Sequence, residues 1–352
     1  MLVWFIACTT AETDTADTLS PSADEVGEHT AATSEISVSG PGGLALPTQL
    51  WYPSQTGDTS PHAYDDWFEG TAVDGDPDCS EPRPVVVFSH GNTGVRYQSI
   101  FLTEHLATHG YVVAAPDHVG NTIFDDGDVP MGELLVRRPA DIAAVFDALL
   151  VEPSLEGCVD PDAGYAVMGH SFGGYTSLAV AGAVIDWDAA GAYCASLKDD
   201  PWLCEEVQAW VAQGGGTVDG ADPRVWAAVP QTPAGYEVLL GGLELIDVPM
   251  MMMGGQNDTL TTMEEEVRPL YEGLTTTPRH LGELEGADHF DFSDACNILD
   301  TYPGCGESPI ELDEAHRLVR AATTAFLGEL RGLDYADAVP WTDTLWTWET
   351  AD

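Results

Sequence analysis

The stretch "YAVMGHSFGGYTSLAVAG" (residues 165–182) places Ser171 between two apolar runs, with Gly169 and Gly173 two residues away on either side. The run before the serine has the character of a buried strand, and the run after it that of a helix. A G-x-S-x-G motif in this context predicts a sharp strand-to-helix turn that exposes the serine hydroxyl. Glycine is expected at both flanking positions because neighbouring backbone passes close to such a turn. Ser171 is therefore our candidate nucleophile.

A serine hydroxyl is a weak nucleophile until a base removes its proton, so the chain should also supply a histidine and an acid. When the serine lies on such a turn, the acid and the histidine follow it in that order. Asp258 comes directly after the apolar strand "VPMMMMGG", and His289 follows the strand "RHLGELEG". Asp258 has an alternative role as a helix N-cap. His280 is the alternative base, but it lies within a strand. We predict a triad of Ser171, Asp258 and His289.

The developing negative charge on the substrate requires two hydrogen-bond donors. One donor is expected to be the backbone N–H of Phe172, directly after the serine. The loop "HGNTG" follows the strand "VVVF", and we assign the second donor to the backbone N–H of Asn92 in this loop. His90, which opens the loop, is expected to pack beneath it, because a triad uses one base.

Strand-like and helix-like segments alternate along the rest of the chain. Strands are expected at "RPVVVFSHG", "YVVAAPDH" and "RVWAAVPQ", and helices at "YQSIFLTEHLATHG", "RRPADIAAVFDALL" and "ELDEAHRLVRAATTAFLGELRG". This alternation predicts an α/β fold with a mostly parallel central sheet and helices on both faces. We expect one catalytic domain over residues 39–333, with a small helical cap at about 186–222 that borders the cleft. The Trp-rich tail, residues 334–352, is expected to pack on the surface.

The charge of the chain limits its partners. The chain has 59 acidic and 11 basic residues, for a formal net charge of −48. This balance excludes nucleic acid and anionic lipid as electrostatic partners and favours solubility. We expect a monomer. The cysteines show no C-x-x-C spacing and no accompanying histidine cluster, so we expect neither a metal nor another cofactor.

Six of the seven cysteines lie in the body of the chain. Their spacing suggests the bridges Cys194–Cys204, Cys296–Cys305 and Cys79–Cys158, although six cysteines allow 15 pairings. Three disulfides would place the protein in an oxidising compartment, either secreted or in a bacterial cell envelope.

The apolar start "MLVWFIAC" (residues 1–8) ends in the seventh cysteine, Cys8. It is similar to the lipobox of bacterial lipoproteins, which predicts lipidation of Cys8 and a membrane contact through that anchor. The run has no basic residues before it and is short for a signal sequence, so an unrelated apolar start is the alternative. Residues 9–38 are acidic and rich in Thr, Asp and Ser, which predicts a disordered tether.

A family resemblance is carried by the segments "LPTQLWYP", "PVVVFSHGNTGVRYQSIFLTEHLATHGYVVAAPDH", "GHSFGG", "DPRVWAAVP" and "GGQNDTLT". Together they resemble the α/β-hydrolase superfamily, in particular serine esterases of the platelet-activating-factor acetylhydrolase and dienelactone-hydrolase-like group. The resemblance implies a cofactor-free esterase that forms an acyl-serine intermediate on short-chain or lipid-like esters. It assigns the catalytic roles to Ser171, Asp258 and His289, with the amides of Asn92 and Phe172 as oxyanion donors.

Two other functions remain open from the sequence. A polyester hydrolase resembling cutinases would use the same chemistry on polymeric substrates. A non-catalytic envelope lipoprotein would keep the hydrolase fold but work by binding. Peptidases and thioesterases share the same triad, so the fold alone does not choose between them.

Overall fold

The computed structural model describes residues 22–55, 60–66, 68–125, 129–197, 203–299, 304–306, 308–333, 335 and 341–351. The predicted lipidation site Cys8 and the first part of the predicted tether lie outside these residues.

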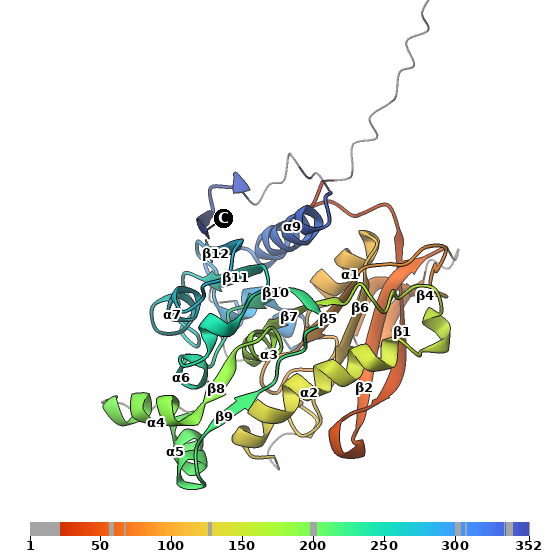
Figure 1. The fold of residues 1–352 in the computed structure, drawn as a ribbon. Coiled ribbons are helices and arrows are strands. Elements are labelled where there is room, and N and C mark those ends of the chain that lie inside the picture. The colour runs from red at the N-terminus through yellow and green to blue at the C-terminus, as the bar shows by residue number, and fades with distance from the viewer. Residues whose placement is uncertain are drawn as a thin grey trace, which may run out of the picture.

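One large sheet runs through the molecule (Figure 1). Over the described residues it contains eleven strands, and the six central ones, from β6 to β12, are parallel to one another. In spatial order the strands are β13 (Trp346–Ala351), β12 (Arg279–Leu284), β11 (Met250–Gly255), β10 (Val225–Gln231), β7 (Tyr165–His170), β5 (Val85–Ser89), β6 (Val112–Pro116), β2 (Ala45–Ser54), β1 (Thr30–Ser39), β4 (Phe68–Asp74) and β3 (Pro61–Tyr64).

Helices cover both faces of the sheet, as the alternation of segments predicts (Figure 1). Helices α1 and α9 pack on one face, and α2 and α3 pack on the other. The helices are α1 (Ile100–Thr108), α2 (Met131–Leu149), α3 (Phe172–Val180), α4 (Trp187–Ser196), α5 (Cys204–Ala212), α6 (Tyr236–Leu239), α7 (Arg268–Glu272), α8 (Ala295–Ile298) and α9 (Leu312–Leu330). The chain therefore has an α/β fold.

Strand β5 shows why the central strands are continuous apolar runs in the sequence. Its five residues are all buried. Val85 and Val87 pack into the core under α2 and α3, whereas Val86 and Phe88 pack into the core under α1 and α9. A strand covered by helices on both faces needs apolar side chains at every position, because neither face meets water.

The segment predicted as a cap contains two helices and two short strands. Strands β8 (Val184–Asp186) and β9 (Thr217–Asp219) pair with each other, and α4 and α5 lie beyond them (Figure 1). The indole rings of Trp187 and Trp210 stack with their centroids 5.1 Å apart.

The prediction of a disordered tether up to residue 38 is wrong for its last part. Residues 30–39 form β1, which pairs antiparallel with β2 from Thr30 opposite Ser54 to Ser39 opposite Ala45. Along its second half, exposed Glu35, Ser37 and Ser39 alternate with the half-buried Ile36 and the buried Val38. The polar composition hides this alternation, and pairing with β2 satisfies the backbone groups.

The prediction that the catalytic domain ends at residue 333 is also wrong, because part of the tail belongs to the sheet. Strand β13 pairs antiparallel with β12 and forms one edge of the sheet. A Cβ atom at Gly282 of β12 would lie 2.6 Å from the Trp348 ring and 2.9 Å from the Trp346 ring. The glycine therefore leaves room for two indoles to pack across the strand.

The described cysteines form the three disulfides that the spacing suggests: Cys79–Cys158, Cys194–Cys204 and Cys296–Cys305. The second joins α4 to α5, and the third closes the loop that follows α8. Across the described ranges, none of the helices is both long and apolar enough to cross a membrane.

Candidate active site

Ser171 occupies the sharp turn between β7 and α3 that the G-x-S-x-G motif predicts. Its backbone has φ 58° and ψ −117°, a conformation that non-glycine residues rarely adopt. The turn is held by the Ser171 N–H, which donates to the Gln231 carbonyl at 2.9 Å, and by the Ser171 carbonyl, which accepts from Ala234 N–H at 3.2 Å. Strain that is fixed by neighbouring strands is typical of a functional position.

The two glycines of the motif allow this turn to pack against strand β5. A Cβ atom at Gly173 would lie 1.9 Å from the carbonyl oxygen of Ser89, and one at Gly169 would lie 2.3 Å from the Gly173 carbonyl oxygen. Both contacts involve backbone atoms that other elements fix. The sequence motif therefore has the steric origin that we expected for it.

Asp258 and His289 come from the loops after β11 and β12 and meet beside the serine turn. His289 Nδ1 lies 2.8 Å from Asp258 Oδ2, and both side chains are buried. Burial opposes the charged form of Asp258, but the hydrogen bonds from His289, Thr261 and Leu260 outweigh it and lower the pKa of this carboxyl. Asp258 is thus a carboxylate that can orient the imidazole and stabilise its positive charge.

The alternative role of Asp258 as a helix N-cap is wrong, because Thr262 is the N-cap of the helical segment Met263–Val267, but the Asp258 carboxylate does hold a turn. Its Oδ1 accepts hydrogen bonds from the N–H groups of Leu260 at 2.8 Å and Thr261 at 2.9 Å. The hydroxyl of Thr261 lies 2.9 Å from Asp258 Oδ2 and 3.1 Å from His289 Nδ1. One carboxylate therefore holds the turn and contacts the histidine, so the two roles do not compete.

The alternative base, His280, lies away from this site. It is on β12, where its ring packs 5.7 Å from the ring of Phe326 and 5.1 Å from that of Trp341.

Ser171 and His289 line the same small pocket, which has a volume of about 70 Å³. The other lining residues are Gly91, Asn92, Thr93, Gly94, Gln98, His170, Phe290, Ser293 and Ala295. Described residues of the segment predicted as a cap are not among them. A carbonyl group placed in this pocket would meet the serine, the histidine and the loop of Asn92 together.

The two predicted oxyanion donors lie on the segments that flank the serine. Phe172 is the first residue of α3, so its N–H belongs to the electropositive end of a helix. Asn92 is exposed at the pocket, and its side-chain Oδ1 accepts a hydrogen bond from Asn121 Nδ2 at 2.7 Å. The next residue, Thr93, has a φ of 55°, which marks a tight turn in this loop. The oxyanion role of both amides stays a prediction.

Sequence reasoning missed two residues that fix the position of His289. His170 Nε2 lies 2.8 Å from the His289 carbonyl oxygen, and His170 Nδ1 lies 3.0 Å from Gln98 Nε2. Gln98 Oε1 in turn accepts from Gly91 N–H at 3.0 Å. His170 was visible inside the motif as its variable residue, but nothing in the sequence linked Gln98 to it.

His90 is buried below the loop that it opens, as expected. Its Nδ1 lies 2.7 Å from the Gly91 carbonyl oxygen, and its Nε2 accepts from the backbone N–H of His118 at 3.0 Å. Sequence reasoning did not identify His118, or the buried Arg138 that donates to the His90 carbonyl.

Two family models match the chain. A model of PET hydrolase-like proteins matches residues 203–303, and a chlorophyllase model matches residues 76–201. Among curated proteins, the chain is 28% identical over 210 residues to cutinase est2 of Thermobifida alba, which covers 58% of this chain and 52% of that protein.

Two further relatives match this chain with similar identity and coverage. A bis(hydroxyethyl) terephthalate hydrolase of Streptomyces coelicolor is 26% identical over 208 residues, covering 58% of this chain and 50% of the relative. Cutinase 2 of Thermobifida cellulosilytica is 27% identical over 210 residues, covering 58% and 60%. The chain thus spans about half the length of the curated relatives it matches. These similarities indicate an α/β-hydrolase esterase family, and the matched families differ from the acetylhydrolase and dienelactone-hydrolase-like group that the motifs resemble.

Proposed function

We propose that the protein is a serine carboxylic-ester hydrolase that acts on polymeric esters of the polyester or cutin type. One observation carries the catalytic part: a strained, pocket-lining Ser171 shares its pocket with His289, whose Nδ1 lies 2.8 Å from the buried Asp258 carboxylate. This proposal follows the alternative interpretation of the sequence more closely than the lipid-like one.

The proposed reaction has two halves. Ser171 Oγ attacks the ester carbonyl while His289 Nε2 takes its proton, and Asp258 stabilises the resulting imidazolium. The carbonyl oxygen becomes an oxyanion that accepts hydrogen bonds from the N–H groups of Asn92 and Phe172. Its collapse breaks the bond to the alcohol, which leaves with the proton from His289. Water, activated by the same histidine, then attacks the acyl-serine and releases the acid.

Two observations support a polymeric substrate. The curated relatives are named as cutinases and as a hydrolase of a terephthalate ester. The pocket volume of about 70 Å³ is small beside the several hundred Å³ of sites that enclose a whole ligand. Such a pocket holds the reacting ester while the rest of a long substrate lies outside it.

The three disulfides favour an oxidising compartment, so we place this activity outside the cytoplasm, either secreted or in the cell envelope.

The test compares the wild type with Ser171→Ala on p-nitrophenyl esters from acetate to palmitate and on a polyester film. We expect wild-type hydrolysis with a short-chain optimum, release of soluble products from the film, and a fall in kcat of about 10⁴–10⁶ in the variant. Folded wild type that hydrolyses none of these esters would contradict the esterase. Ester hydrolysis without film release, together with cleavage of short-chain phospholipids, would favour the acetylhydrolase-like interpretation.

A further inference from the structure

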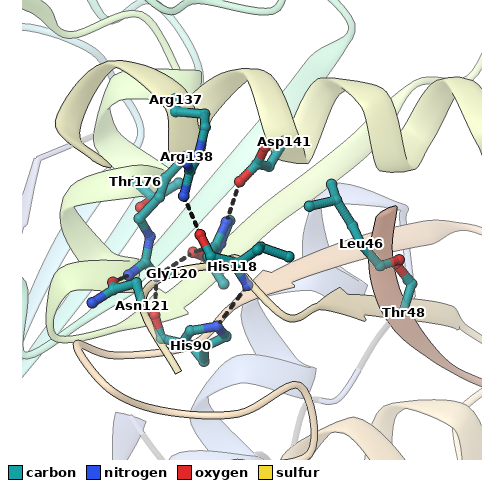
Figure 2. Close-up of polar contacts among 12 residues, drawn as sticks. Leu46, Thr48, His90, His118, Gly120, Asn121, Arg137, Arg138, Asp141 and Thr176 are labelled. Atoms are coloured by element: carbon teal, nitrogen blue, oxygen red, sulfur yellow. Dashed lines mark hydrogen bonds and ion pairs between the residues drawn. The ribbon is translucent and has the colours of Figure 1, made fainter. Parts of the chain in front are cut away.

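Arg138 is a charged side chain enclosed in the core directly below the site. It lies on α2, its exposed fraction is 0%, and Figure 2 shows it among Asn121, His90 and His118. Burial lowers its pKa to about 9, which leaves it charged at neutral pH. A buried charge is costly unless its partners compensate for it, so the groups that hold this guanidinium indicate what it does.

The partners of Arg138 lead to the loop that carries Asn92. One arm of the guanidinium donates from Nη1 to Asn121 Oδ1 at 2.6 Å, and Asn121 Nδ2 donates to Asn92 Oδ1 at 2.7 Å. The other arm, Nη2, donates to the His90 carbonyl oxygen, two residues before Asn92. The fork of a single guanidinium thus fixes the loop at two points.

The same side chain also contacts the second predicted donor. The guanidinium carbon of Arg138 lies 4.4 Å from the ring centroid of Phe172, at the start of α3. A guanidinium over an aromatic face is attracted to it, and burial strengthens the attraction. Arg138 therefore touches both segments whose amides flank the pocket.

A buried hydrogen-bond chain holds the guanidinium in place. Arg138 Nη2 also donates to Ser89 Oγ at 3.0 Å, so the Ser89 hydroxyl points its proton at His118 Nε2, 2.9 Å away. His118 Nδ1 then donates to Asp141 Oδ2 at 2.8 Å (Figure 2). The hydrogen bonds connect this serine, histidine and aspartate as in a catalytic triad. All three side chains are buried, so this hydrogen-bond chain has no access to substrate.

From these contacts we infer that Arg138 is a positioning residue for the oxyanion hole, holding the Asn92 and Phe172 amides at the separation that the transition state requires. The inference rests on the proposed esterase function. Its physical basis is that oxyanion donors act only when they are fixed before the charge develops. Lysine has one donor centre and no fork, so it cannot hold the His90 carbonyl and Asn121 as the guanidinium does.

The test uses 4-nitrophenyl acetate and its thiono analogue, in which sulfur replaces the carbonyl oxygen and accepts hydrogen bonds poorly. The ratio of kcat/KM for the two esters reports on the oxyanion donors, and the concentration of folded enzyme cancels from it. For Arg138→Lys we expect kcat on the oxygen ester to fall about 10- to 100-fold with KM little changed, and the oxygen-to-sulfur ratio to fall about fivefold or more.

A second variant keeps the test decisive if Arg138→Lys does not fold. Asn121→Asp retains an acceptor for Arg138 but removes the donor to Asn92, so the ratio should fall in this variant as well. The matched control is Arg224→Lys. Like Arg138, Arg224 lies over an aromatic ring, that of Phe146, but it pairs with Asp222 and lies at the opposite ends of the strands. The oxygen-to-sulfur ratio of kcat/KM for Arg224→Lys should equal that of the wild type.

The outcomes distinguish the positioning role of Arg138 from the proposed esterase function. Hydrolysis that depends on Ser171, with unchanged ratios in Arg138→Lys and Asn121→Asp, would overturn the positioning role and leave the esterase intact. Folded wild type that hydrolyses neither ester would overturn the proposed function and this inference with it.

Discussion

His170 Nε2 lies 2.8 Å from the backbone carbonyl oxygen of His289, so the residue before the candidate nucleophile holds the backbone of the candidate base. Burial lowers the pKa of His170 to about 3, and this imidazole is therefore neutral at pH 7. The Gln98 amide donates to Nδ1, which leaves the single ring proton on Nε2 to donate to His289. The tautomer of one histidine thus fixes the position of the other.

Replacing His170 should affect catalysis through this contact. In His170→Ala the His289 loop loses its hydrogen bond to β7, and we expect kcat to fall about 10- to 100-fold because small displacements of a base are costly. KM for p-nitrophenyl acetate should change less than kcat, because the lost contact acts on the position of the base. A variant with wild-type kcat and a lowered melting temperature would limit His170 to a structural role.

Gly173→Ala should prevent the elbow from packing. The new Cβ atom would lie 1.9 Å from the Ser89 carbonyl oxygen, and neither backbone segment can move without disturbing the sheet. We expect a loss of more than about 3 kcal/mol in the free energy of unfolding or no soluble protein at all. The matched control is Gly42→Ala, where φ is 69° and no atom lies within 4 Å of the new Cβ. That variant should lose only about 1–2 kcal/mol. Gly173 lies within helix α3 and has no positive φ, so a loss no larger than that of Gly42→Ala in chemical denaturation would contradict the close-packing argument.

The sequence was enough to place Ser171, Asp258 and His289 because each follows a buried strand, and parallel strands bring such loops to one edge of the sheet. Arg138 and Gln98 escaped prediction for the opposite reason. Each lies in a helix or loop without a motif. The His170 ring that Gln98 contacts is 72 residues away, and the His90 carbonyl that Arg138 contacts is 48 residues away, so only the folded chain brings them near. Contacts of this kind depend on side-chain geometry, which local patterns do not encode.

The two errors in the fold have a similar origin. The alternating part of β1 is short, and the acidic, Thr-rich residues before it hid it. Strand β13 is rich in tryptophan and follows a polar segment, features that predict surface packing and do not indicate its pairing with β12. Strand β13 is an edge strand, whereas β1 lies between β2 and β4, but both have exposed side chains, and weaker apolar patterns suffice where part of a strand meets water.

The disulfides should contribute unequally to stability. Cys79–Cys158 spans 79 residues, whereas Cys194–Cys204 spans 10. Chain-entropy arguments give about 4.5 kcal/mol for the longer loop and about 2.7 kcal/mol for the shorter one. We therefore expect Cys79→Ser/Cys158→Ser to lower the midpoint of chemical denaturation more than Cys194→Ser/Cys204→Ser. The reverse order, measured without reductant, would contradict this ranking.

The buried His316 should make the protein sensitive to acid. It lies on α9, its Nε2 is 3.0 Å from the Ser293 carbonyl oxygen, and burial lowers its pKa from 6.5 to about 4. Between these two values the unfolded chain binds a proton that the folded chain does not. The free energy of unfolding therefore falls as the pH drops through 6.5 towards 4, by about 1–3 kcal/mol from this group.

His316→Gln keeps a donor for the Ser293 carbonyl but cannot be protonated, which isolates this effect. Asp294, whose pKa burial raises to about 6, acts in the opposite direction but is present in both proteins, so it cancels from the difference. We expect the variant to be less stable at pH 7, where the stacking of His316 on Phe101 is lost, yet to lose less stability between pH 7 and pH 4.5. Denaturation curves measured across this range would decide the point. Parallel loss in both proteins would mean that other groups dominate the acid response.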